Sequence, residues 1–153
     1  MTDDTRDRDL AAIRLVVQAF FAAFTSGPGS STRLGALRAL LLPEAVIVRT
    51  GGAEPLVHGV EEFIAPREAL LGGGALIDFS EWPLAGRTEV FGDVAHWFGG
   101  YEKAGVHDGA EFTGRGMMSL QLVRTSPGWR ISAAAWDDER EGLSIPTTPY
   151  DGS

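Results

Sequence analysis

Hydrophobic and polar positions follow a helical period in the first part of the chain. Between residues 7 and 25 apolar side chains recur every three or four positions, which is typical of a helix with one buried face. They are Leu10, Ile13, Val17, Phe20, Phe21 and Phe24. A second leucine repeat predicts a helix over residues 33–42 that Pro43 would end. We expect residues 1–6 to form a frayed tail.

Short segments connect these helices to the second half of the chain. Residues 45–50 (AVIVRT) predict a strand, and residues 56–58 predict a shorter extended piece after a glycine-containing loop. A third helix is expected after Gly59. Pro66 should kink or split it, because a proline in a helix interior removes a hydrogen bond. Three consecutive glycines at 72–74 would end this helix.

From Ala75 to Arg140 the pattern changes to segments rich in aromatic and β-branched residues. Three turn signals separate these segments: Gly92-Asp93, Asp108-Gly109 and Pro127-Gly128. They predict a four-stranded antiparallel meander that holds all four tryptophans. Helices grouped before a meander indicate an α+β fold, because parallel sheets alternate strands with helices. We expect a single domain over residues 1–153, with its core at about 8–138 and an irregular tail at 141–153.

Alternation within the meander predicts apolar groups on both faces of the sheet. One face of the third strand carries Phe112, Met118, Leu120 and Leu122. In the second strand Ala95, Trp97 and Tyr101 alternate with Val94, His96 and Phe98. Three helices can cover only one face, so we expect a second copy of the chain to cover part of the other.

Composition excludes several classes of protein. Without cysteine the chain has no disulfide, thiolate metal site or cysteine nucleophile. A net charge of −8 would repel nucleic-acid phosphates. No apolar run approaches the roughly 20 residues of a membrane span, and the charged N-terminus lacks a signal-peptide pattern. Twelve arginines against one lysine, with no asparagine, suggest a GC-rich bacterial genome, so a cytoplasmic bacterial protein is expected.

The element order and four local stretches resemble the nuclear transport factor 2-like superfamily. The stretches are FFAAFTSG, VHGVEEF, FGDVAHW and SLQLVRTSPGWRISAAAW. That superfamily includes ketosteroid isomerases, limonene epoxide hydrolase and SnoaL-like cyclases. The resemblance, over about residues 8–138, implies a curved antiparallel sheet, a cystatin-like cone, wrapped around the long first helix. It also implies a pocket at the open end and frequently a homodimer through the sheet. Because members include enzymes and non-catalytic proteins, it marks the fold rather than an activity.

No signature of a particular reaction is recognisable. Arg49 and Thr50 end the first strand where a ketosteroid isomerase-like acid would be sought, and the first helix has no tyrosine. Arg115 with Asp137 or Asp138 is the nearest approximation to the Asp-Arg-Asp set of limonene epoxide hydrolase. The three histidines lack metal-ligand spacing, and phosphate-binding glycine motifs are missing. We therefore expect neither a metal nor a cofactor.

Several side chains remain candidates for a polar site. Arg115 could bind a carboxylate or polarise a carbonyl, or it could lie at the surface or a dimer interface. His58 could act as an acid or base, or hydrogen-bond to nearby backbone. Glu81 could reach the pocket mouth, although an exposed edge carboxylate is the preferred interpretation. The expected ligand-binding set is Phe20, Phe24, Arg49, His58, Trp97, Tyr101, Arg115 and Trp136, although the aromatic members could instead simply form core.

Two kinds of function fit these observations. The chain could be a small-molecule binder or a cofactor-independent SnoaL-like enzyme of isomerase, cyclase or hydrolase type, with an apolar ligand in the cone. Alternatively, it could be a non-catalytic homodimeric domain with a structural or interaction role. The aromatic residues of the meander favour the first, and the absence of a recognisable acid–base pair favours the second.

Overall fold

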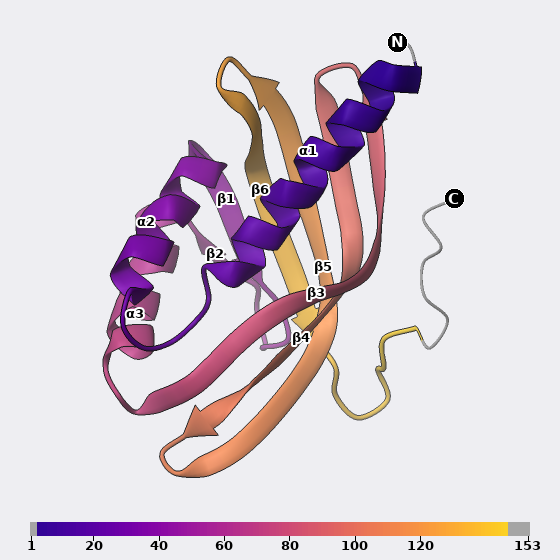
Figure 1. Ribbon diagram of the computed structural model, residues 1–153. Coiled ribbons are helices and arrows are strands. Elements are labelled where there is room, and N and C mark those ends of the chain that lie inside the picture. Colours follow the sequence, from indigo (N-terminus) through magenta and orange to yellow (C-terminus); the bar gives the residue numbers. More distant parts are fainter. Residues whose placement is uncertain (1–2, 147–153) are drawn as a thin grey trace.

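The computed structural model describes residues 3–146 and shows a curved six-stranded sheet with three helices (Figure 1). The elements are α1 (Asp3–Ala22), α2 (Ser30–Leu40), β1 (Leu41–Arg49), β2 (Leu56–His58), α3 (Val60–Gly72), β3 (Leu76–Phe91), β4 (Val94–His107), β5 (Ala110–Thr125) and β6 (Gly128–Asp138). Adjacent strands follow the order β2-β1-β6-β5-β4-β3. The predicted α+β class and the four-stranded meander are confirmed.

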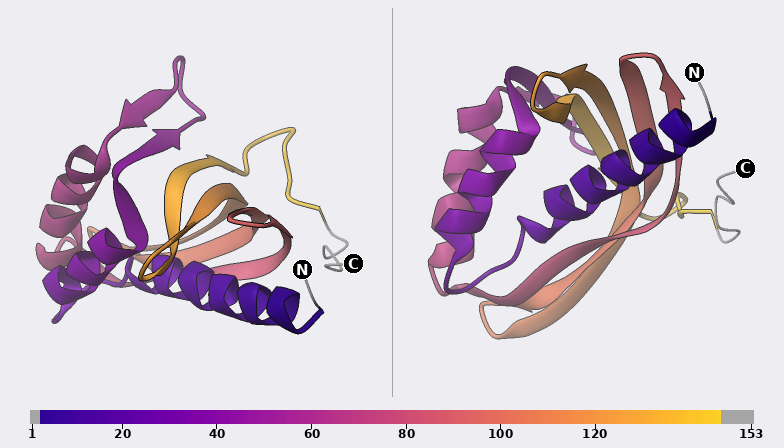
Figure 2. Two further views of the ribbon diagram at one scale, coloured as in Figure 1. Left: turned by 90° about the horizontal axis from the view of Figure 1, so that it is seen from above. Right: turned by 45° about the horizontal axis from the view of Figure 1, so that its top comes forward.

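The sheet is mixed rather than wholly antiparallel. All neighbours are antiparallel except β1, which runs parallel to β6 and pairs Arg49 with Trp136. Figure 2 shows the sheet curving around α1, with α2 and α3 side by side at its β1 side. Register shifts within β3 and between β1 and β6 mark bulges, which bend strands locally. This curvature leaves space between the sheet and the helices.

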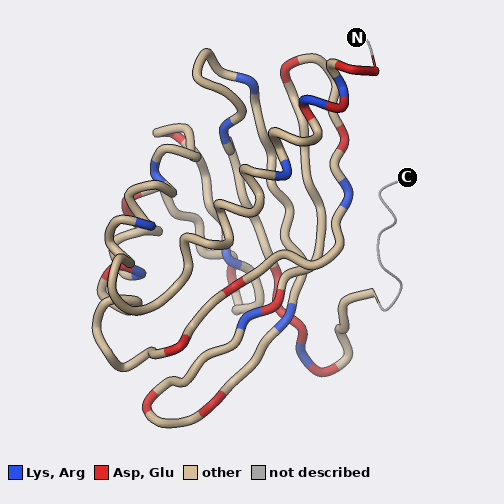
Figure 3. Tube along the Cα trace, viewed as in Figure 1, with Lys and Arg blue, Asp and Glu red and all other residues tan. Residues whose placement is uncertain are grey.

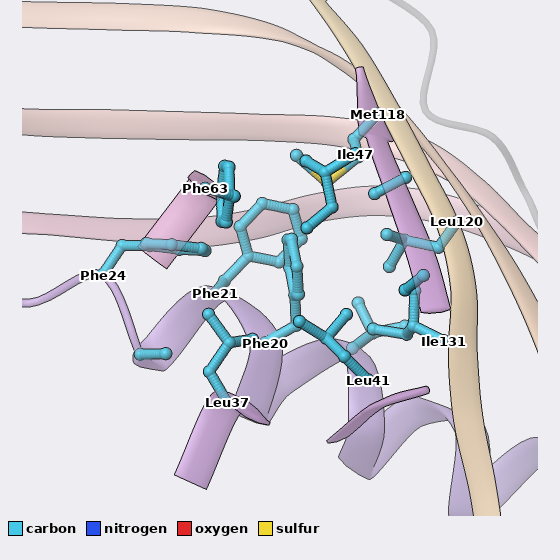
Figure 4. Packing of buried hydrophobic residues seen from close by; sticks show 14 of the residues in the cluster. Phe20, Phe21, Phe24, Leu37, Leu41, Ile47, Phe63, Met118, Leu120 and Ile131 are labelled. Carbon is cyan, nitrogen blue, oxygen red and sulfur yellow. The ribbon is translucent and has the colours of Figure 1, made fainter. Parts of the chain in front are cut away.

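The apolar stripe of α1 forms the centre of the core. Ile13, Val17, Phe20 and Phe21 are buried, as their spacing predicts. Figure 4 shows the phenylalanines of α1 among Leu37 of α2 and Ile47, Leu120 and Ile131 of the sheet. Burying each such side chain contributes about 1.5–3 kcal/mol relative to leaving it in water. Helix packing on the sheet is therefore the main source of stability.

Three predicted boundaries are wrong. Residues 3–6 belong to α1, so they are not a frayed tail. Pro43 lies inside β1, which begins directly after α2, because Leu41 already pairs with Ile131 of β6. The register shift between Leu41 and Val46 accommodates the proline, which has no N–H to donate. Pro66 lies inside α3, which continues past it as one helix, so the predicted split is wrong, and the alternative of a kink stays a prediction.

The C-terminal tail has little regular structure where it is described. An isolated bridge between Arg140 and Leu143 closes a turn, and the chain is irregular up to Pro146. The rest of the predicted tail, 147–153, lies outside the described residues. No helix within residues 3–146 has both the length and the apolar character needed to cross a membrane.

A buried carboxylate ties the start of α1 to the sheet. Asp9 is only 5% exposed and accepts two hydrogen bonds from Arg124 of β5, at 2.9 and 2.8 Å. Arg124 also bonds to Asp93 in the β3–β4 turn, and its guanidinium lies 4.5 Å from the Trp129 ring centroid. The hydrogen bonds to Arg124 hold the pKa of Asp9 below its usual value.

The outer face of the sheet carries exposed apolar side chains, as the alternation predicts. Val94 is 51% exposed and Phe98 is 42% exposed, whereas Ala95, Trp97 and Tyr101 are buried under the helices. The second subunit expected over this face stays a prediction.

Candidate functional site

A cavity of about 640 Å³ lies between the sheet, the end of α1 and α3. Its walls are mainly aromatic: Phe20, Phe24, Phe63, Phe79, Phe112, Met118 and Trp136. Its basic and acidic lining consists of Arg49, Arg67, Glu81, Lys103, Glu111 and Asp138, and His107 also lines it. A cavity of this size with apolar walls and few polar groups is typical of small-molecule sites.

The aromatic wall is a chain of edge-to-face contacts that links three elements. Phe20 of α1 contacts Phe24, which lies just after the end of this helix, with ring centroids 5.2 Å apart. Phe24 contacts Phe63 of α3 at 5.9 Å, and Phe63 contacts Trp136 of β6 at 5.9 Å. Figure 4 shows Phe24 on the chain that follows α1 and Phe63 on α3. Because such pairs favour fixed ring orientations, this side of the cavity is preorganised.

Next to the aromatic wall lies a row of polar groups that the strand register brings together. Glu81 of β3 stands opposite Lys103 of β4, and Tyr101 stands opposite Gly116 of β5. Gly116 in turn pairs with Asp138 of β6. Figure 3 shows acidic and basic positions gathered on this lower, curved part of the sheet. Residues that are far apart in sequence therefore share one patch of the cavity.

Two glycines let long side chains lie flat across β5. A Cβ atom at Gly116 would lie 2.6 Å from Cζ of Tyr101 and would also clash with its hydroxyl and with the Asp137 carbonyl. A Cβ at Gly114 would lie 2.9 Å from Cε of Lys103. Only glycine permits this approach, so Tyr101 reaches over β5 to the neighbouring strand.

Asp138 is the acceptor at the end of this row. The Tyr101 hydroxyl donates a hydrogen bond to Oδ1 of Asp138, and Lys103 Nζ lies 3.6 Å from Oδ2. Burial raises the pKa of Tyr101 above its ordinary value, and the bond to Asp138 raises it further. Tyr101 is therefore a neutral hydrogen-bond donor at physiological pH.

Glu81 is the acid–base candidate of the cavity. Burial raises its pKa to about 7, and the negative charge of Asp138 adds to this effect. The positive charges of Lys103 and Arg67 oppose the shift without cancelling it. Part of the carboxyl surface faces the cavity, and protein surrounds the rest. A carboxyl group that is half-ionised near neutral pH can both accept and donate a proton.

Arg67 extends from α3 into the same cavity. Its guanidinium carbon lies 3.7 Å from the ring centroid of Phe63, and Nη1 donates a hydrogen bond to the Phe63 carbonyl at 3.0 Å. Burial lowers the pKa of Arg67 to about 10, and repulsion from Arg49 contributes. Arg67 remains charged at neutral pH in a site that disfavours its charge.

Five of the eight side chains expected at the site line this cavity. They are Phe20, Phe24, Arg49, Tyr101 and Trp136. Trp97 instead packs against α1, in a groove with Leu10 and Val17. Arg115 lies 3.3 Å from Glu139 and lines a separate hollow, and His58 ends β2 outside the cavity lining. Arg115 therefore pairs with neither Asp137 nor Asp138, which bond to Arg140 and to Tyr101 respectively.

Sequence reasoning missed Arg67, Lys103 and the role of Asp138, and it preferred an exposed position for Glu81. Glu81 lies on the edge strand as expected, but its side chain lines the cavity. One signal was present: glycines alternate at 114 and 116 inside a strand. Alternation puts both on one face, where they mark a close approach of other side chains.

Metal ligands are not grouped in the structure. Within residues 3–146 no three histidine or acidic side chains come close enough together to hold a metal ion. The chemistry that the cavity can offer comes from its own groups: the carboxyl of Glu81, the hydroxyl of Tyr101 and three cationic side chains.

Solved structures show the same arrangement of elements. LinA matches with a TM-score of 0.74 and 15% identity, over 97% of this chain and 100% of LinA. A nuclear transport factor 2-like protein of unknown function from Silicibacter pomeroyi DSS-3 has a TM-score of 0.62 and 21% identity, over 91% of this chain and 100% of that protein. An uncharacterised protein with a cystatin-like fold from Caulobacter vibrioides has a TM-score of 0.65 and 16% identity, over 87% of this chain and 91% of that protein.

Sequence comparison adds no nearer relative. No protein-family model matches the chain, and no curated protein matches it. At the identities found among solved structures, a likeness establishes the fold and leaves the activity open.

Proposed function

We propose that this chain, which has the nuclear transport factor 2-like fold, binds a small and mostly apolar molecule in the cavity between sheet and helices. The observation that carries the proposal is the pairing of an aromatic wall with a polar row in a cavity of about 640 Å³. Apolar walls supply affinity through burial, and a few polar groups fix the orientation of the ligand.

The polar row suits cofactor-independent proton transfer of the isomerase, cyclase or hydrolase type. Glu81, with a pKa of about 7, would take a proton from the ligand or return it. Tyr101 would donate a hydrogen bond to an oxygen on which negative charge develops, releasing its bond to Asp138. General acid–base catalysis by one such group contributes about 10²–10⁴-fold to a rate.

Thermal denaturation with a panel of apolar ligands tests the binding proposal. A ligand at about 100 times its Kd stabilises the folded state by about 2.7 kcal/mol, which for this chain corresponds to an increase in Tm of about 5–10 °C. Leu70→Trp would narrow the cavity, because Leu70 is a partly exposed lining residue of α3. Leu15→Trp is the matched control on an exposed face of α1.

Ligands are expected to stabilise the wild type and Leu15→Trp and to stabilise Leu70→Trp much less. If no apolar ligand raises Tm, or if Leu70→Trp responds as the wild type does, the cavity is not the binding site.

A second candidate function is that of a non-catalytic homodimeric domain. The observation that favours it is the exposure of Val94 and Phe98 on the outer face of the sheet. Exposed apolar patches of this kind mark interaction surfaces. Light scattering after gel filtration is expected to show a dimer that Phe98→Asp converts to a monomer. A wild-type monomer at micromolar concentration would exclude a dimer through this face.

A further inference from the structure

We propose that the ligand of this cavity carries a carboxylate group, which the guanidinium of Arg67 binds, attached to an aromatic or similarly flat apolar body. The inference rests on the proposed binding function and adds to it the chemical class of the ligand. It assigns to Arg67 the role of binding this carboxylate, because the contacts of Arg67 with the chain leave part of its guanidinium without an acceptor.

The first argument is that Arg67 is held in place and yet lacks an anionic partner. Stacking on Phe63 at 3.7 Å and the bond from Nη1 to the Phe63 carbonyl fix the plane of its guanidinium. Within residues 3–146 neither Nε nor Nη2 has a protein acceptor, and no carboxylate oxygen lies within 4.0 Å. A planar fork with two free donors matches the two oxygens of a carboxylate.

Other arginines that pack against protein have hydrogen-bond acceptors supplied by the chain. Arg124 contacts the carboxylates of Asp9 and Asp93, and Arg38 contacts those of Glu61 and Glu68. Each of these two arginines has two acidic partners supplied by the chain, whereas Arg33 donates to the backbone carbonyls of Thr25, Ser26 and Pro28. Arg67, which is more enclosed by protein, has none, so the missing anion is expected from outside.

The second argument is the charge balance inside the cavity. Nζ of Lys103 lies 3.6 Å from Oδ2 of Asp138, so these two opposite charges form an ion pair. Burial raises the pKa of Glu81 to about 7, so this group carries only part of a negative charge at neutral pH. Arg49 lines the same cavity and repels Arg67, and within residues 3–146 the acidic lining residues Glu81 and Glu111 form no ion pair with either arginine. An anionic ligand group relieves this repulsion, although the chain as a whole carries a charge of −8.

The third argument is the surroundings of Arg67. Its guanidinium carbon lies 6.0 Å from the Trp136 ring centroid, and the aromatic wall continues through Phe63 to Phe24. A carboxylate at Arg67 therefore places the attached apolar group against aromatic rings. Glu81 and Tyr101 line the same cavity.

Isothermal titration of the wild type with 2-naphthoate, 2-naphthamide and 2-naphthylmethylamine tests the inference. The three probes share one aromatic body and differ in charge. We expect 2-naphthoate to bind at least about tenfold more tightly than the amide, because one charge-assisted bidentate contact contributes that much. Arg67→Met keeps an apolar stem and should reduce the preference to about twofold or less. Arg87→Met removes an exposed arginine of β3 outside the cavity and should leave the preference unchanged.

Each outcome decides between the two proposals. Equal binding of acid and amide, or tighter binding of the amine, overturns the carboxylate assignment while the cavity remains a binding site. A preference for the acid that survives in Arg67→Met overturns the role of Arg67. If none of the probes binds the wild type, the carboxylate assignment fails, and the panel of apolar ligands decides the binding proposal separately. Should Arg67→Met not fold, as judged by circular dichroism, Arg67→Gln provides the same comparison, and the acid-to-amide ratio of the wild type already decides the first point.

Discussion

The most direct test of the site geometry is the replacement of Gly116 by alanine. The added Cβ would lie 2.6 Å from Cζ of Tyr101, well inside van der Waals contact, and would also meet the Tyr101 hydroxyl and the Asp137 carbonyl. Because the Asp137 carbonyl is backbone, the strand cannot simply move aside. Overpacking of this kind costs about 1–3 kcal/mol. For a chain of 153 residues we therefore expect Tm to fall by about 2–12 °C.

Gly35→Ala is the matched control for this change. Gly35 lies inside α2, and an added Cβ there meets nothing within 4 Å. Alanine in a helix interior is more favourable than glycine by about 0.8–1.0 kcal/mol, so Gly35→Ala should raise Tm by about 2–4 °C. Replacement of glycine by alanine is thus expected to change Tm in opposite directions at the two sites. Differential scanning calorimetry of both variants measures them directly.

A second readout connects the change to the site. If Tyr101 must leave Gly116, its hydrogen bond to Asp138 is lost, and the phenol becomes more exposed to solvent. Spectrophotometric titration should then show a lower pKa for Tyr101 in Gly116→Ala than in the wild type, since burial is the main cause of the raised value. A Gly116→Ala variant that is as stable as the wild type and has an unchanged tyrosine titration would refute this geometry.

Two further predictions concern pH. Glu81 has a folded-state pKa of about 7, above its unfolded value, so its contribution to the free energy of unfolding is full in acid and is lost as pH rises through about 7. Urea unfolding should therefore show that Glu81→Gln gains stability relative to the wild type between about pH 5 and about pH 8. A difference in stability that stays constant with pH would contradict a raised pKa. Asp9 has a depressed pKa because of Arg124, so its contribution is present above its unfolded pKa and is lost as pH falls through the folded value. Asp9→Asn should lower Tm at neutral pH much more than Asp4→Asn, which lies on the exposed face of α1. The difference in Tm between the two variants should become smaller in strong acid. Equal effects of the two substitutions at neutral pH would show that the Arg124 contact is unimportant.

The sequence predicts the fold because its local signals agree with one another. The stripe of α1 and the three turns of the meander are short-range patterns, and each maps onto an observed element. The errors occur where long-range pairing prevails over a local signal. Pro43 reads as the end of a helix, yet pairing of Leu41 with Ile131 places it in a strand.

The site was less predictable because its polar row depends on strand register. Glu81, Tyr101 and Asp138 come together only when β3 to β6 align as they do, and a shift of one residue would turn each side chain to the other face. The position of Arg67 depends on the packing of α3 against β1, which brings Phe63 to Trp136 and which no local pattern indicates. Aromatic positions were easier to predict. An apolar side chain that points to the helix side of the sheet belongs either to the core or to a cavity wall.

Lys103 gives the cavity a natural spectroscopic probe. It is the only lysine among thirteen basic residues, and it lies beside Asp138 in the polar row. Reagents that modify primary amines therefore address this one side chain and the chain's own N-terminal amine. Reductive methylation with ¹³C-formaldehyde would keep the positive charge of Lys103 and add a single side-chain signal inside the cavity. That signal would report ligand occupancy and the ionisation of neighbouring groups without any engineered label.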